Sequence, residues 1–275
     1  MRLVVRDLAK EFVTEDRKVR ALAGVNFEVR DGEFFGIIGP TGCGKTTLLH
    51  IIAGMDKPTR GEVEFVGERR TRALVSMVFQ DASLMPWRTV ARNVPLGPEF
   101  RKEPIPLYKR AAQFFLDMVR LLDFSGVHPA ELSGGMKQKA ALARALANDP
   151  EMILMDEPFA SLDAQTRLLL REEVTRIWEK EKKTIILVTH NIEEAVMLCD
   201  RVAVMSAVPG VVKSIIPIDV RRPRDLKSMS DPDFVKCLHQ IWDLLRSEVE
   251  KEMKKNRPAG TAGRAGARNP HSDGW

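Results

Sequence analysis

Cysteine is scarce in this sequence, and the three cysteines, Cys43, Cys199 and Cys237, lie far apart. None of them belongs to a Cys-x-x-Cys pair or to a cluster of cysteine and histidine. A disulfide scaffold and a structural zinc site both need such spacing, so the sequence argues against either. We therefore expect a protein of a reducing compartment.

Long apolar runs are also missing. No stretch approaches the roughly 20 apolar residues that a membrane-spanning helix needs. The first residues, MRLVVRDLAKEF, carry charges where a secretory signal peptide would be apolar. Glycine and proline, with 18 and 16 residues, are near average usage, which excludes a collagen-like or low-complexity chain. We expect a globular protein of the cytoplasm, unless a partner holds it at a membrane.

The body of the chain lacks a strong charge of either sign. The net charge is +5, but the segment from Lys251 to Trp275 has six basic and two acidic residues and so accounts for four of these charges. A basic surface for nucleic acid is therefore not expected. Residues 256–275 are rich in Gly, Ala, Arg and Pro and have no apolar periodicity, so we predict a disordered basic tail.

Short apolar runs alternate with helical patterns along the chain, which predicts an α/β fold with a mostly parallel sheet. Two runs, Leu3–Val5 and Val63–Val66, are expected in a small antiparallel β portion. The strands of the main sheet are expected at Phe34–Ile38, Val75–Phe79, Ile153–Met155, Ile185–Val188 and Val202–Met205.

Helical patterns dominate from about residue 81 to 150, at Lys109–Leu122 and Met136–Ala147, and predict an inserted helical subdomain. A further helix is predicted over residues 230–255, because Pro232 suits a first helical turn and apolar residues follow at helical spacing. We expect this helix to dock on the chain's own body, which we assign to a domain of residues 1–229.

The strand predicted at Phe34–Ile38 runs directly into a glycine-rich loop and a helix. The loop reads Gly39-Pro40-Thr41-Gly42-Cys43-Gly44-Lys45-Thr46, the pattern Gly-x-x-x-x-Gly-Lys-Thr, and Thr47 opens the helical run. Its glycines let backbone N–H groups turn toward an anion, and the helix start adds partial positive charge. We expect Lys45 to reach the outer phosphates and the Thr46 hydroxyl to bind magnesium. The loop predicts a P-loop NTPase core with nucleotide contacts from Gly39 to Thr47, in a kinase, a GTPase or an ATPase.

A second apolar run, Met152–Met155, ends in Asp156-Glu157-Pro158. A buried strand of this kind delivers Asp156 to the magnesium shell beside the phosphate loop. Glu157 then emerges at the carboxyl end of the strand, where it can orient and deprotonate an attacking water. We predict Asp156 as a metal ligand and Glu157 as the catalytic base.

Leu132-Ser133-Gly134-Gly135-Met136 opens an alanine- and leucine-rich helix. With the phosphate loop and the Asp-Glu strand, in this order, it strongly resembles the ATP-binding-cassette family over about the first 220 residues. The resemblance implies that Gln80 is the glutamine that contacts magnesium and the attacking water, and that His190 contacts the γ-phosphate. It further implies that Asp163 belongs to the D-loop and that Phe12 stacks on adenine, although an apolar residue near an N-terminal strand is more often part of the core.

The resemblance also implies a second copy of the chain, or a paralogous cassette. In the family, two domains lie head to tail, and the Ser133, Gly134 and Gly135 segment of one completes the ATP site of the other. Many members have glutamine where this chain has Met136. The groups expected to bind ATP, the Ser133 hydroxyl and the Gly135 N–H, do not need that side chain. The cofactors implied are ATP and Mg²⁺, with Cys43 close to the nucleotide.

The segment Leu84-Met85-Pro86-Trp87-Arg88-Thr89-Val90, followed by Asn93-Val94, resembles the importer ATPases for nitrate, aliphatic sulfonates and taurine. So do Met205–Ala207, Pro209-Gly210 and Arg221–Asp225. This branch implies a permease partner at the cytoplasmic face of the cell membrane, a solute-binding protein as an indirect partner, and no contact between the cassette and the solute. Trp87 is expected either to line the permease groove or to pack inside the helical insertion.

Two other functions stay open at this point. The first is a cassette that acts on nucleic acid or ribosomes instead of transport, although such proteins commonly have two cassettes or a long insertion. The second is a non-catalytic regulatory cassette, against which the intact Lys45, Asp156, Glu157 and His190 argue.

Overall fold

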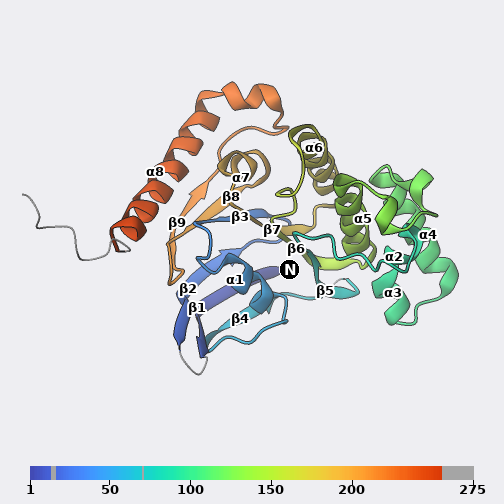
Figure 1. The fold of residues 1–275 in the computed structure, drawn as a ribbon, viewed down its shortest axis with the longest axis horizontal. Coiled ribbons are helices and arrows are strands. Elements are labelled where there is room, and N and C mark those ends of the chain that lie inside the picture. The colour runs from blue at the N-terminus through green and yellow to red at the C-terminus, as the bar shows by residue number, and fades with distance from the viewer. Residues whose placement is uncertain (14–16, 70, 256–275) are drawn as a thin grey trace, which may run out of the picture.

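The computed structural model describes residues 1–13, 17–69 and 71–255, which form two β-sheets and the helices packed on them (Figure 1). The larger sheet has six strands in the order β5-β6-β7-β3-β8-β9, and the smaller has three in the order β2-β1-β4. In the larger sheet the neighbours from β5 to β8 are parallel, and only the edge strand β9 is antiparallel. The predicted α/β class is therefore confirmed. The strands of this sheet are β3 (Phe34–Ile38), β5 (Ala73–Val78), β6 (Pro150–Asp156), β7 (Thr184–Thr189), β8 (Arg201–Met205) and β9 (Val212–Pro217).

The central strand β3 shows why the larger sheet is buried on both sides. All five of its residues are inaccessible, and successive side chains point to opposite faces. Phe34 and Ile38 join the core formed with α5, α6, α7 and α8, whereas Phe35 and Ile37 join the core formed with α1 and the smaller sheet. The sheet thus separates two hydrophobic cores, as is usual for parallel strands.

The smaller sheet is antiparallel and consists of β1 (Arg2–Val13), β2 (Lys18–Val29) and β4 (Arg60–Val66). It is longer than predicted: β1 spans twelve residues, and β2 carries no prediction at all. Register shifts interrupt the β1–β2 pairing in three places, so the apolar alternation that marks a strand is broken. The edge strand β9 is missing from the prediction for a related reason, since only Ile216 in it is buried.

The helical insertion and the C-terminal helix lie at opposite ends of the larger sheet (Figure 1). The insertion between β5 and β6 lies at the β5 edge, and α8 lies at the β9 edge, with its carboxyl end beyond the strand. The insertion holds α2 (Val90–Asn93), α3 (Leu96–Phe100), α4 (Ile105–Met118) and α5 (Gly134–Ala147), and the other helices are α1 (Lys45–Ile52), α6 (Ala164–Glu181), α7 (Ile192–Leu198) and α8 (Pro232–Lys255). Short 3₁₀ turns cover Leu122–Phe124, Pro129–Glu131 and Leu226–Ser230.

Two helix boundaries differ from the sequence prediction. The helix predicted at Lys109–Leu122 starts at Ile105 and ends at Met118, because Pro106 fits its first turn and Arg120 takes a left-handed φ of 57° that closes it. The C-terminal helix docks on the body as predicted, with Phe234 and Ile241 fully buried. The predicted tail at 256–275 lies outside the described residues, and the division of the chain at 229 and 255 stays a prediction.

None of the described helices combines the length and the apolar character needed to cross a membrane.

Candidate functional site

The glycine-rich loop joins β3 to α1 at the carboxyl edge of the larger sheet. Gly42 and Gly44 have positive φ angles of 79° and 98°, which other residues adopt only with strain, and Gly44 is the N-cap of α1. The Lys45 side chain is buried, and its ammonium donates to the carbonyl oxygens of Gly39 (2.9 Å) and Pro40 (2.8 Å). The loop thus curls around the lysine charge at the start of a helix, which is an anion-binding arrangement.

Cys43 contributes its backbone to this loop, and its side chain points into the core, with Sγ 3.9 Å from the Lys45 ammonium. The thiol is fully buried in the core beneath the smaller sheet, and burial raises its pKa. A Cβ added at Gly39 would come within 2.8 Å of this sulfur. The thiol is thus closed off from solvent, and the closeness of Cys43 to a nucleotide stays a prediction.

Thr46 and Asp156 bring the loop and β6 together. The Thr46 hydroxyl donates to Asp156 Oδ1 at 3.2 Å, and Asp156 is almost completely buried at the end of its strand. Burial raises the pKa of this carboxyl, although the hydrogen bond from Thr46 opposes the shift. A hydroxyl and a carboxylate beside a phosphate-binding loop are the hard oxygen ligands that Mg²⁺ prefers, and Mg²⁺ needs few of them when phosphates bind it too. These residues therefore fit the predicted metal.

Glu157 and His190 meet at the same edge. Glu157 follows β6 with a left-handed φ of 46°, and its N–H donates to the carbonyl of Val188 in β7. Its Oε2 lies 2.9 Å from His190 Nδ1. The carboxylate is only partly exposed, whereas the imidazole is 59% exposed. The two side chains predicted from separate motifs form one hydrogen-bonded pair.

A hydrogen-bonded ion pair, which the sequence did not predict, fixes the turn that carries His190. Glu194 of α7 is buried, and it accepts hydrogen bonds from the Thr189 hydroxyl (2.6 Å) and from Arg171 of α6 (2.5 Å). The Asn191 side chain caps α7 by accepting from the Glu194 N–H. His190 thus projects from a turn whose two flanking residues are fastened to a buried ion pair. Glu194 belongs to no sequence motif, so its pairing with Arg171 could not be predicted from the sequence.

Phe12 is exposed and does not belong to the core. Its ring is 42% exposed, with the Lys10 ammonium 4.9 Å from the ring centroid. Phe12 pairs with Val19 of β2, and farther along β2 the chain touches the phosphate loop, since a Cβ at Gly44 would lie 2.8 Å from Leu22 and 2.9 Å from the carbonyl of Ala21. The hairpin that carries Phe12 therefore also borders the loop.

The Ser133-Gly134-Gly135 segment begins α5 beside the start of α6. The Ser133 hydroxyl caps α5 by accepting from the Met136 N–H at 3.3 Å, and Ser133 and Gly134 are exposed. A Cβ at Gly135 would collide with the methyl of Thr166, so glycine is required for this close approach. The Asp163 carboxylate caps α6, and the hydrogen bonds from Thr166 lower its pKa.

Gln80 lies two residues after β5 and is exposed. It borders a hollow of about 370 Å³ together with Gly134, Gln138 and Ser161. Gln138 was not predicted as a functional residue, yet its side chain donates to the backbone of Gln80. The Gln80 segment, the start of α5 and the Ser161 turn therefore meet around one hollow.

Trp87 is 73% exposed, which decides against packing inside the helical insertion. The loop that presents it is built around Asn93, which is fully buried. Asn93 Oδ1 accepts from the Met85 N–H at 2.7 Å, and Nδ2 donates to the carbonyls of Met85, Arg88 and Thr89. A buried side chain with all these bonds holds the loop rigid, so Trp87 is presented in a defined place.

The arginines of the 221–225 segment are structural. Arg224 is buried and donates to the carbonyls of Val196, Cys199, Ile218 and Val220, and burial lowers its pKa to about 10. Arg222 pairs with Asp200 at 2.8 Å and stacks on Trp178. These contacts fix the chain between β9 and α8 on the end of α7.

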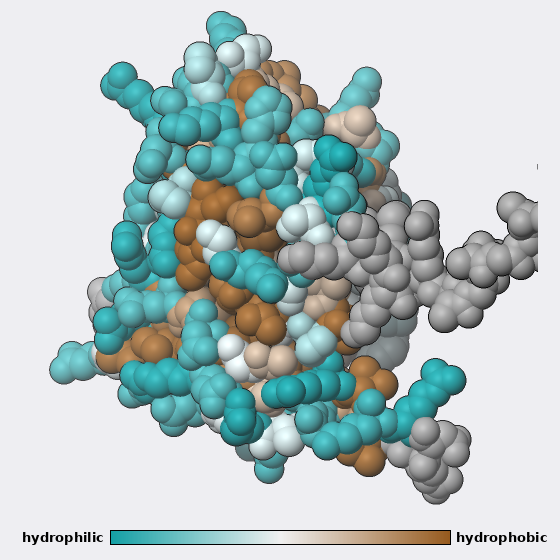
Figure 2. Space-filling model, turned by 90° about the vertical axis from the view of Figure 1, so that its left-hand side faces the viewer, coloured by the Kyte–Doolittle hydropathy of each residue, from teal (hydrophilic) through white to brown (hydrophobic). Residues whose placement is uncertain are grey.

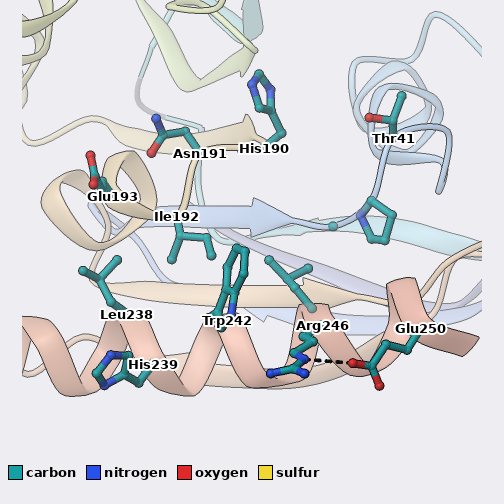
Figure 3. A pocket seen from close by; sticks show the side chains of 13 residues that line it. Thr41, His190, Asn191, Ile192, Glu193, Leu238, His239, Trp242, Arg246 and Glu250 are labelled. Carbon is teal, nitrogen blue, oxygen red and sulfur yellow. Dashed lines mark hydrogen bonds and ion pairs between the residues drawn. The ribbon is translucent and has the colours of Figure 1, made fainter.

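An apolar groove of about 1150 Å³ separates α8 from the phosphate loop (Figure 2). Gly39, Pro40, Thr41 and His190 line one side, and the other side comes from α8. In Figure 3, Leu238 and Trp242 point from α8 toward Ile192, and Arg246 is paired with Glu250 at 2.8 Å. Trp242 is 57% exposed. Leu238 and Leu245 pack against the core, as expected of the apolar stripe of α8, and also border this groove.

The described residues contain no cluster of three or more His, Cys, Asp or Glu side chains that would hold a metal by itself.

Comparison with known proteins shows the family of the chain. The family model described as ABC transporter matches residues 22–160. The chain belongs to the ABC transporter family. An uncharacterised ABC transporter ATP-binding protein of Methanocaldococcus jannaschii is 48% identical over 256 residues, which are 92% of this chain and 95% of that protein.

Two further relatives of this ABC protein are named as import proteins. The nitrate import ATP-binding protein NrtD of Synechocystis sp. is 40% identical, over 92% of this chain and 98% of its own length. The aliphatic sulfonates import ATP-binding protein SsuB of Bacillus thuringiensis subsp. konkukian is also 40% identical, over 84% and 91%. These names favour transport over the nucleic-acid alternative.

A solved structure similar to this ABC protein is a dimeric ATP-binding cassette in a post-hydrolysis state, bound to ADP and Pi. It is 32% identical and has a TM-score of 0.69, with 78% of this chain and 98% of that chain covered.

Proposed function

We propose that this ABC protein is the ATP-hydrolysing subunit of an importer for a small anionic solute such as nitrate or an aliphatic sulfonate. One observation carries the hydrolytic part of the proposal. Four side chains from the first turn of α1, the end of β6 and the turn after β7 meet at one edge of the sheet. Thr46 lies 3.2 Å from Asp156, and Glu157 lies 2.9 Å from His190. The import part rests on the 40% identical nitrate and sulfonate import proteins.

The loop from Gly39 to Thr47 holds the phosphates in this proposal. Its backbone N–H groups and the start of α1 neutralise negative charge, and the Lys45 ammonium exchanges the Gly39 and Pro40 carbonyls for phosphate oxygens. Thr46, Asp156 and Gln80 would hold Mg²⁺, which supplies Lewis-acid stabilisation of the charge on the phosphates. Phe12 offers its exposed ring to the adenine from the neighbouring hairpin.

Glu157 and His190 act on the terminal phosphate and the water that attacks it. Glu157 accepts a proton from the water, and the hydrogen bond with His190 keeps the carboxylate turned toward the site. His190 is more than half exposed, so its ring has room to turn and donate to a γ-phosphate oxygen. Glu194 and Arg171 hold the turn that carries it.

A second copy completes the site. Ser133 and Gly134 at the start of α5 are exposed, and neither lines the groove that the phosphate loop borders. A head-to-tail partner would receive this helix start on its ATP, and the similar cassette bound to ADP and Pi is a dimer. Asp163 supports this surface by capping α6 beside it.

The permease would dock on the surface around Trp87. Aromatic side chains that are exposed and held rigidly are common anchors of interfaces, and Asn93 provides the rigidity here. The bidentate pair of Arg88 with Glu99 ties this loop to α3. The chain would then lie at the cytoplasmic face of the cell membrane, with a solute-binding protein delivering solute to the permease on the other face.

The test is the variant Glu157→Gln, compared with the wild type and with Glu193→Ala as a matched surface control. We expect ATP binding to persist and phosphate release to fall by about 10²- to 10⁴-fold, since a general base contributes roughly that much. The variant should form a stable dimer with ATP in sedimentation experiments, and replacing Ser133 with tryptophan should abolish that dimer. Phosphate release near the wild-type rate in Glu157→Gln would overturn the proposal.

A further inference from the structure

Two side chains of α5 hold the backbone of the segment that follows β5. Gln138 Nε2 donates to the carbonyl oxygens of Gln80 (2.6 Å) and Phe79 (3.3 Å). Arg144 donates to the carbonyls of Ser83 (2.7 Å) and Ala82 (2.8 Å). The remaining carbonyl of this stretch, that of Asp81, accepts from the Ser83 hydroxyl. The carbonyls from residue 79 to 83 thus depend on α5 and on one local hydroxyl, not on the sheet, which ends at Val78.

Burial makes these bonds matter. Gln138 is 3% exposed, and its Oε1 is buried without a partner among the described residues. The amide is therefore oriented by its Nε2 alone, because a flip would turn its oxygen toward two carbonyl oxygens. Arg144 is half-buried, and burial lowers its pKa. Removing the buried Gln138 amide leaves the carbonyls of Phe79 and Gln80 without this donor, which costs free energy.

The helix that carries both side chains begins at Ser133. Gln138 lies little more than one turn from this cap, and α5 is a single helix of 14 residues. Gly134 and Gln80 border the same hollow as Gln138. A displacement of the Gln80 backbone is thus passed to the start of α5 through one side chain.

We propose that Gln138 and Arg144 are positioning residues that fasten residues 79–83 to α5, so that Gln80 and the Ser133 segment move as one body. Binding of ATP near Gln80 in one copy then changes the position of the Ser133 segment of the same copy. That segment contacts the ATP of the other copy. The coupling between the two ATP sites rests on the proposed function. The attachment of residues 79–83 to α5 depends only on the hydrogen bonds of Gln138 and Arg144.

The fastening is tested by hydrogen exchange on the full chain, with Gln138→Leu compared to the wild type. Leucine keeps most of the buried volume and removes both hydrogen bonds. We expect amides of residues 79–84 to exchange about 5- to 150-fold faster, which corresponds to two lost bonds. The matched control is Lys139→Ala, because Lys139 on the same helix forms no hydrogen bond or ion pair within the described part of the chain. Unchanged exchange of residues 79–84 in Gln138→Leu would overturn the inference.

The coupling is tested by steady-state phosphate release and by ATP binding to the single copy. A positioning role predicts that kcat falls by about tenfold or more while single-copy ATP affinity stays within about twofold, since the phosphate loop is untouched. A purely structural role would weaken both together. Arg144→Lys keeps a cationic donor and should retain more of kcat than Arg144→Met, and this pair also serves if Gln138→Leu fails to fold. Faster exchange with an unchanged kcat would refute the coupling.

The two proposals fail in different ways. A wild-type protein that releases no phosphate would overturn the proposed function and the coupling with it, while the exchange experiment would still decide whether Gln138 and Arg144 hold the segment.

Discussion

Removing the Glu194 carboxylate should destabilise the protein through one defined contact. Glu194 is 4% exposed, and it is the partner of Arg171, whose side chain is only 12% exposed. Its other oxygen accepts from the Thr189 hydroxyl at 2.6 Å. The substitution Glu194→Ala leaves the guanidinium of Arg171 buried without a countercharge. Breaking a buried ion pair in this way costs about 3–5 kcal/mol.

The expected change in melting temperature follows from the size of the chain. For a domain of this size, 1 kcal/mol shifts Tm by about 2–4 °C, so Glu194→Ala should lower Tm by about 6–20 °C in a calorimetric scan. The matched control is Glu193→Ala, which removes the neighbouring exposed carboxylate and should change stability by less than about 0.5 kcal/mol. The double variant Arg171→Leu with Glu194→Leu should recover most of the loss, because a buried ion pair exchanged for apolar residues is often neutral.

The same variant tests how His190 is held. The Thr189 hydroxyl beside His190 loses its acceptor in this variant, whereas Asn191 keeps its hydrogen bond from the backbone N–H of residue 194. We expect kcat for ATP hydrolysis in Glu194→Ala, measured well below its Tm, to fall by about tenfold to a hundredfold. A Tm within about 2 °C of the wild type would refute the contribution of the Arg171–Glu194 pair to stability. An unchanged kcat in a destabilised variant would refute the role of this pair in placing His190.

Three further outcomes are expected. All three cysteines are buried and burial raises the pKa of Cys43, so a bulky maleimide should label the native protein far more slowly than the urea-unfolded chain; complete labelling within minutes would contradict the burial of the thiols. Asn93→Ala removes four hydrogen bonds, and the Met85 N–H and the Arg88 carbonyl lose the partner that Asn93 gave them, so it should lower the free energy of unfolding in urea by about 2 kcal/mol or more, whereas the exposed Arg92→Ala should change little. Chelation of divalent metal should stop phosphate release and added Mg²⁺ should restore it; release at the full rate without metal would exclude the role proposed for Thr46 and Asp156.

Patterns of neighbouring residues predicted the strands and turns that carry the proposed chemistry. The phosphate loop needs glycines at particular places between a strand and a helix, and Gly42 and Gly44 have the positive φ angles that this implies. The apolar run before Asp156 is a strand buried along its whole length. The prediction failed where apolar alternation was weak, as in β2 and β9, and where a helix end depended on Arg120 taking a left-handed conformation.

The sequence by itself determined the family resemblance, the strand–loop–helix at Gly39–Thr47 and the order of the motifs, because each depends on contiguous residues and their local backbone. Only the tertiary structure decided which side chains support them. Glu194 reaches Arg171 across 23 positions, and Gln138 reaches Gln80 across 58. Contacts over such separations leave no local periodicity, since they arise when packed helices and strands bring distant residues within hydrogen-bonding distance. For the same reason, the exposure of Trp87 and Phe12 and the groove beside α8 appeared only once the sheet and its helices were in place.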